Sequence, residues 1–296
     1  NINIVLNVIE KIKESGENLY NPSKEVFLSN FKFSENEFYS DICTDALLEI
    51  SSSDDFDKFD AIILDEAQLF SQKQILAIKN LLSDEEPSMF LFADTFQFVN
   101  FGESDATFWS PPDSDIKFRP LPKLLRNYRT SNAVTKFMNT MAGTKLQMLN
   151  IEGQLYGPVK AKSAEWVVKL EEAVEKLLEY FEPSEIVVLS PSRNFIENKF
   201  KELNQEKLFG ANYILDIRDK SYVDNDGILF SSVRRFTGRQ SKAVILLLPD
   251  ENVMREEIAL NYSQLAFIGA GRAEHTLWVI HSPGIDNKLN FDELVV

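Results

Sequence analysis

The chain has 296 residues, of which 44% are hydrophobic and 11% aromatic, a composition typical of globular proteins and unlike that of disordered ones. The net charge of −15 argues against nonspecific binding of nucleic acid by the surface as a whole, because attraction to phosphates needs a basic surface. The single cysteine, Cys43, excludes an internal disulfide and a cysteine-based metal site, and the two histidines argue against a histidine-rich one.

The same features bear on cellular location. No basic segment followed by an apolar one opens the chain, and no apolar run approaches the roughly 20 residues that a membrane span needs. A lone cysteine fits a reducing compartment. We therefore expect a soluble, cytoplasmic protein with no membrane partner.

Short apolar runs separated by helical patterns predict an α/β fold with parallel sheets. The helices are well signalled: Ser71 and Gln74 form a predicted capping box, and amphipathic stripes follow Ser131 and Ser163. The predicted strands cover residues 61–64, 89–93, 186–189, 228–233, 244–248 and 277–280.

The proline-bearing stretch at residues 110–123 interrupts this alternation. A chain of this length favours two domains, and we place them at residues 1–118 and 119–296. Acidic residues are dense before about residue 115, whereas two basic clusters follow that point. The clusters comprise Lys117, Arg119, Lys123, Arg126, Arg129 and Lys136, and then Arg234, Arg235, Arg239 and Lys242.

The stretch "IILDEAQ" ends a predicted strand in two adjacent carboxylates, Asp65 and Glu66. Ligands of open α/β sheets bind beyond the carboxyl ends of the strands, so this position favours a site, although a solvated turn is the alternative reading. Asp-Glu-x-Gln is a nucleoside triphosphatase signature in which the first acid serves Mg²⁺ and the second acts on the attacking water.

This stretch and four later ones resemble motifs II to VI of the UvrD/Rep-like superfamily 1 helicases, in the same order and over about residues 58–282. The later four are "MFLFADTFQF", "LPKLLRNYRTSNAV", "FSSVRRFTGRQSKAVILLLP" and "YSQLAFIGAGRAEHTLWVI". The resemblance implies tandem RecA-like domains of the P-loop NTPase type with parallel sheets, the first domain being incomplete. It also implies ATP and Mg²⁺ as cofactors and single-stranded DNA as a partner.

Roles for individual residues follow from the resemblance alone. Each arginine has a surface charge or ion pair as its alternative role, and each phenylalanine has core packing. The implied catalytic residues are Asp65, Glu66, Gln97, Arg129 and Arg272, with Asp65 and Glu66 also serving the metal. The implied cofactor-binding residues are Asp65, Gln68, Asp94, Tyr128, Gly238 and Gln240, and the implied nucleic-acid-binding residues are Phe98, Phe101, Arg234 and Arg235.

The sequence departs from the family in several places. No G-x-x-x-x-G-K-[ST] phosphate-binding loop is present. Gln240 replaces a ribose-binding glutamate, Thr237 a lysine, Gly271 a threonine and Ala93 a glycine. Too few residues separate Arg193 from Ser231 for the family's accessory 2B domain, since a domain usually needs at least about 50.

These departures leave two interpretations. In the first, the chain is the C-terminal portion of an ATP-dependent DNA helicase or translocase, inactive alone because it begins between the phosphate loop and motif II. In the second, it is a non-catalytic, helicase-like scaffold that binds a partner protein or nucleic acid. The compact form predicted here resembles helicase-like modules that are attached to nuclease or defence-associated domains.

Overall fold

The computed structural model describes residues 43–51, 58–67, 70–83, 88–93, 124–202, 212–215, 227–250 and 262–288. The chain divides into two compact units. The first is made of Asn1–Thr95 and Glu103–Arg119, and the second of Phe96–Gly102 and Pro120–Val296. The proline-bearing stretch at residues 110–123 lies outside the described residues.

In the first unit, two short strands form a parallel pair. Strand β1 (Ala61–Leu64) pairs with β2 (Ser88–Leu91), and helix α5 (Gln72–Lys79) lies between them in sequence. Helix α4 (Cys43–Ser51) packs on α5. A parallel pair needs a crossover connection, and α5 provides it.

The capping box predicted at the start of α5 is confirmed. The Gln74 side chain accepts a hydrogen bond from the Ser71 backbone N–H at 2.8 Å, and the Ser71 hydroxyl accepts one from the Gln74 N–H at 3.3 Å. Two of the backbone N–H groups at the start of the helix, which lack helical partners, are satisfied in this way.

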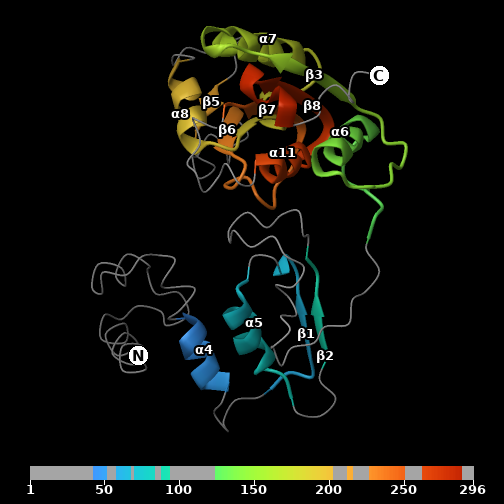
Figure 1. Ribbon diagram of the computed structural model, residues 1–296, viewed down its shortest axis with the longest axis vertical. Coiled ribbons are helices and arrows are strands. Elements are labelled where there is room, and N and C mark those ends of the chain that lie inside the picture. The colour runs from blue at the N-terminus through green and yellow to red at the C-terminus, as the bar shows by residue number, and fades with distance from the viewer. Residues whose placement is uncertain are drawn as a thin grey trace, which may run out of the picture. The chain divides into compact units, whose positions relative to one another are not determined.

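The second unit is built on a six-stranded sheet in the order β3-β8-β7-β4-β6-β5, and every adjacent pair is parallel (Figure 1). The predicted α/β fold with parallel sheets is therefore confirmed. The strands are β3 (Gln154–Lys160), β4 (Ile186–Ser190), β5 (Tyr213–Ile214), β6 (Ile228–Ser232), β7 (Ser241–Leu248) and β8 (Ala273–His281).

Helices cover both faces of this sheet (Figure 1). Helices α6 (Asn132–Ala142) and α11 (Tyr262–Ala270) lie on one face, and their buried side chains pack with Val187, Leu189 and other apolar residues. Helices α7 (Trp166–Leu178) and α8 (Arg193–Glu202) cover the other face, where Ile186 and Val188 point. Successive residues of β4 thus face opposite layers, as expected of a central strand.

Helix ends and short 3₁₀ turns complete the unit. The Ser131 hydroxyl accepts a hydrogen bond from the Val134 N–H at 3.4 Å at the start of α6, and Gly143 ends this helix in the left-handed conformation. The 3₁₀ turns are η5 (Ser163–Glu165), η6 (Pro183–Glu185) and η8 (Pro283–Lys288). None of the helices in the described segments is both long enough and apolar enough for a membrane span.

Candidate functional site

In the first unit, Asp65 and Glu66 directly follow β1, at the carboxyl end of the parallel pair. Backbone hydrogen bonds hold this position on both sides. The Phe92 N–H donates to the Leu64 carbonyl at 2.8 Å, and the Ala67 N–H donates to the Phe92 carbonyl at 2.9 Å. The two acids are therefore held between two bonds to the chain that leaves β2.

The backbone at Glu66 is unusual. Its φ is +50°, in the left-handed region that residues other than glycine seldom adopt. The Asp65 Oδ1 atom accepts a hydrogen bond from the Glu66 N–H at 2.9 Å, and the next residue, Ala67, is fully buried. A residue held in such a conformation costs about 1–3 kcal/mol, and such residues cluster at functional sites.

The pair of acids fits Mg²⁺. Magnesium prefers carboxylate oxygens and is usually held by one or two of them, with water and substrate phosphate oxygens completing the shell. The Asp65 side chain is exposed, and it follows directly on the strand end where such a ligand would lie. Within the described ranges no group of three or more histidine, cysteine or acidic residues gathers.

Five of the predicted site residues lie outside the residues that the structure describes. They are Gln68, Asp94, Gln97, Phe98 and Phe101. Their roles stay predictions.

In the second unit, three predicted residues come from segments that meet at the amino ends of the strands. Arg272 immediately precedes β8, and its carbonyl accepts a hydrogen bond from the Ser241 N–H at 2.9 Å. Gln240, which directly precedes Ser241, therefore lies at the same end of the sheet. The Ser131 N–H donates to the Glu274 carbonyl at 2.8 Å, and this bond places the loop that carries Arg129 at the start of β8 as well.

The loop before α6 is organised by the side chain of Asn127. Its Oδ1 atom accepts hydrogen bonds from the backbone N–H groups of Arg129 at 3.0 Å and Thr130 at 3.3 Å. Its Nδ2 atom donates to the hydroxyls of Thr130 and Thr135, the latter at 3.0 Å. Tyr128 and Arg129 are thereby left on the surface, with Tyr128 70% exposed.

The two threonines of this network are functional-site residues that the sequence motifs did not indicate. Thr135 is fully buried and also donates to the Ser131 carbonyl at 2.9 Å. The available signal was a group of small hydroxyl residues after Asn-Tyr-Arg. Thr130 and Ser131 follow it directly, and Thr135 comes four positions after Ser131. Such side chains commonly bond nearby backbone groups at helix starts.

Replacing Asn127 with alanine should destabilise the chain by about 1–3 kcal/mol, because several polar groups lose a partner and two of them, the hydroxyls of Thr130 and Thr135, belong to buried residues. Asn127→Asp should have a smaller effect, since it keeps the acceptor for the two backbone N–H groups. Urea unfolding of the 296-residue chain measures both. Asn198→Ala, at an exposed position of α8, is the control and should change stability by less than about 0.5 kcal/mol. An equally small change for Asn127→Ala would contradict the assigned network.

Arg272 differs from Arg129 in its surroundings. Its side chain is only 4% exposed, whereas Arg129 is exposed. The preceding residue, Gly271, packs close to α6, and a Cβ atom there would lie 3.1 Å from the Met138 Cε atom. Glycine at this position therefore fits a tight approach of this turn to the helix.

The segment between β6 and β7 carries the remaining candidates. The Val233 N–H donates to the Ser190 carbonyl at 3.0 Å, so exposed Arg234 and Arg235 follow the carboxyl end of the sheet. Gly238 has a φ of +80°, which an L side chain rarely adopts, and it is exposed. The structure thus separates Arg234 and Arg235 from Gln240, which lies at the amino ends of the strands.

A further basic residue of this region, Lys242, forms an ion pair. Its ammonium group contacts the Glu185 carboxylate, and the hydrogen bond from Lys242 lowers the pKa of the Glu185 carboxyl. The Ser241 hydroxyl donates to the Glu185 carbonyl at 2.5 Å. The second basic cluster of the sequence is therefore partly neutralised in the fold.

No known protein family matches the sequence, and no curated protein matches it either. Among solved structures, the chain is similar to the C-terminal domain of a possible DNA helicase from Lactobacillus plantarum WCFS1, with 17% identity and a TM-score of 0.36 over 54% of this chain and 92% of that one. It is also similar to the arterivirus nonstructural protein 10 helicase, with 15% identity and a TM-score of 0.41. That match covers 78% of this chain and 39% of the viral one.

Proposed function

We propose that this chain is the motif II to motif VI portion of a superfamily 1 ATP-dependent DNA helicase or translocase. In this proposal the natural full-length protein binds ATP with Mg²⁺ and moves along single-stranded DNA. Asp65 serves the metal and Glu66 acts on the attacking water. Arg129 and Arg272 stabilise the charge that develops on the transferred phosphoryl group.

One observation carries the proposal most strongly. The segments that bear Arg129, Gln240 and Arg272 are far apart in sequence, yet backbone hydrogen bonds of Ser131 and Ser241 bring them to the same edge of one sheet. A solvated surface arginine needs no such grouping. An anionic ligand does, because its charge is best stabilised by several donors fixed in advance.

The chemistry of the residue types agrees with this role. Guanidinium groups are planar and permanently charged, and they match the oxygens of a phosphoryl group in geometry. A strand end that presents two carboxylates, one of them with a strained backbone, suits metal and water positioning. Gln240 retains the capacity to hydrogen-bond a ribose hydroxyl.

The proposal predicts that ATP turnover depends on chain length. The 296-residue chain, which contains no G-x-x-x-x-G-K-[ST], should show no ATPase activity stimulated by single-stranded DNA, whereas the natural full-length protein should show it. A phosphate-release assay with and without a DNA oligonucleotide measures both. Turnover by the 296-residue chain that Glu66→Gln abolishes would contradict the first expectation, and an inactive full-length protein would contradict the second.

The burial of Arg272 supports a second candidate, a helicase-like scaffold that no longer hydrolyses ATP. A side chain that is 4% exposed can hold a turn in place without touching a ligand. In that case the full-length protein would bind its partner protein or nucleic acid equally well with and without ATP. Partner binding measured in the two conditions separates the candidates.

A further inference from the structure

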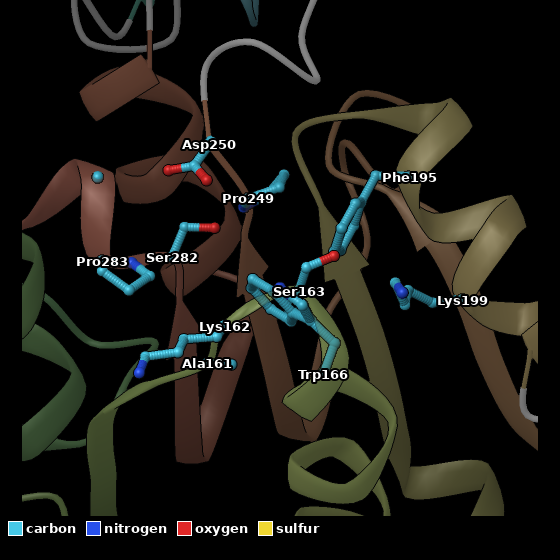
Figure 2. Close-up of a pocket in the computed structure, with 11 residues that line it drawn as sticks. Ala161, Lys162, Ser163, Trp166, Phe195, Lys199, Pro249, Asp250, Ser282 and Pro283 are labelled. Carbon is cyan, nitrogen blue, oxygen red and sulfur yellow. The ribbon is translucent and has the colours of Figure 1, made fainter.

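A pocket lies at the carboxyl ends of the strands in the second unit, at the edge of the sheet opposite to Arg272 and Gln240. Its volume is about 440 Å³, which falls in the range of small-molecule sites. Figure 2 shows the side chains around it. The lining residues are Ala161, Lys162, Ser163, Trp166, Phe195, Lys199, Pro249, Asp250, Ser282, Pro283 and Gly284.

Four separate parts of the chain build this pocket, and three of them follow directly on strand ends. Ala161 follows β3, Pro249 follows β7 and Ser282 follows β8. Phe195 and Lys199 come from α8, which follows β4. The pocket therefore gathers the exits of four strands that are adjacent in the sheet order β3-β8-β7-β4.

The position coincides with a switch in the topology of the sheet. From β4 the chain passes to α8 on one face, and from β7 it leads on to α11 on the other face, although β4 and β7 are neighbours. Chains that depart to opposite faces leave a crevice between them. In open α/β sheets this crevice, outside the carboxyl ends of the strands, is where ligands bind.

Three polar side chains converge on the pocket. The Ser282 side chain is 4% exposed and points into it, with Asp250 nearby and Ser163 across the opening (Figure 2). Among the described residues, none of these three side chains has a hydrogen bond or an ion pair. The Ser282 hydroxyl, on a residue that is itself buried, is therefore available to a ligand in the pocket.

Glycine at position 284 makes room for the carboxylate. A Cβ atom there would collide with the Asp250 Oδ1 atom. Any larger residue would force the Asp250 side chain to move. The local sequence is thus compatible with a carboxylate kept at the rim of the pocket.

The remaining walls are apolar and cationic. The rings of Trp166 and Phe195 meet edge to face with centroids 4.9 Å apart, and the Lys199 ammonium lies 5.5 Å from the Phe195 centroid while it is paired with Glu202. Lys162 lies at the pocket's edge and is exposed. The lining residues themselves therefore carry two positive charges and one negative charge.

From these groups we propose that the pocket binds a phosphorylated sugar, either free or as the ribose phosphate of a nucleotide. The Asp250 carboxylate accepts hydrogen bonds from sugar hydroxyls, as acidic residues at such crevices do for ribose. The hydroxyls of Ser163 and Ser282 can donate as well as accept. Lys162 supplies the charge for the phosphate, since Lys199 is paired with Glu202, and the apolar walls contact the carbon face of the sugar.

Isothermal titration of the 296-residue chain with ribose 5-phosphate, adenosine 5′-monophosphate, ribose and inorganic phosphate tests this inference. Ribose 5-phosphate should bind at least tenfold more tightly than ribose or phosphate alone, because the site contacts both parts. A further gain of tenfold or more with adenosine 5′-monophosphate would identify a nucleotide as the ligand. Equal binding of the two would identify a free sugar phosphate.

Substitutions of pocket residues test whether the ligand binds at this pocket. Asp250→Asn and Ser282→Ala should each weaken binding of ribose 5-phosphate at least tenfold, with circular dichroism spectra like that of the unsubstituted chain. Glu175→Gln, an acid-to-amide change at an exposed position of α7, should bind normally. The inference is overturned if neither phosphorylated probe binds, if phosphate alone binds as tightly as ribose 5-phosphate, or if both pocket variants bind like the unsubstituted chain.

This test is separate from that of the proposed function, because it uses the 296-residue chain and needs no ATP turnover. None of the pocket residues belongs to the segments around Asp65, Arg129 or Arg272. A full-length protein without ATPase activity would leave the binding result unchanged.

Discussion

Replacing Glu66 with glutamine in the natural full-length protein should lower the kcat of ATP hydrolysis about 10²–10⁴-fold, the usual contribution of a positioned general base. The KM for ATP should change little, because glutamine has the same shape and the acid acts on water in the transition state. Steady-state phosphate release at saturating single-stranded DNA measures both constants.

Asp60→Asn is the matched control for this experiment. Asp60 is exposed and directly precedes β1, whereas Glu66 lies just beyond the carboxyl end of the same strand. This variant should retain normal turnover. Equal, measurable turnover by Glu66→Gln and the unsubstituted protein would rule out the role of Glu66. Turnover by neither protein would leave the scaffold interpretation.

Removing either Arg129 or Arg272 should lower kcat about 10³-fold or more, since an arginine that stabilises a phosphoryl transition state typically contributes 10³–10⁵-fold. The two alanine variants should differ in stability. Arg129 is exposed, so Arg129→Ala should leave the free energy of unfolding within about 0.5 kcal/mol. Arg272 is buried, so Arg272→Ala should also destabilise the protein.

Arg272→Lys separates the catalytic from the structural contribution. Lysine keeps the charge but lacks the planar fork of donors, so turnover should remain low while part of the stability returns. Arg193→Ala, an exposed position on α8 paired with Glu197, is the control and should hydrolyse ATP normally. Normal turnover in Arg129→Ala would exclude that residue from the transition state.

The strands that the sequence predicted and those that it missed differ in a physical way. Strands β4 and β6 are buried along their whole length, and apolar runs reveal such strands directly. The two missed strands, β3 and β5, form the two edges of the sheet. β3 contains Gly157 and Pro158 and a shift of register, features that edge strands tolerate and that hide a strand from periodicity.

The candidate sites show the same division. Asp65 and Glu66 could be predicted because a strand and its terminal acids are contiguous in sequence. The grouping of Arg129 with Arg272 followed from resemblance and not from spacing, since it depends on which strands lie side by side. The pocket at Asp250 and Ser282 could not be predicted, because it requires the sheet order and the face to which each helix departs.

The crossing from β6 to β7 has a mechanical consequence. Residues 233–240 run along the whole length of β4, since the Val233 N–H bonds Ser190 at one end and the Ser241 hydroxyl bonds Glu185 at the other. Phe236, in the middle, is 2% exposed and is packed in the core. The segment is therefore anchored at both ends and in the middle, so Arg234 and Gln240 are held a fixed distance apart at opposite ends of the sheet.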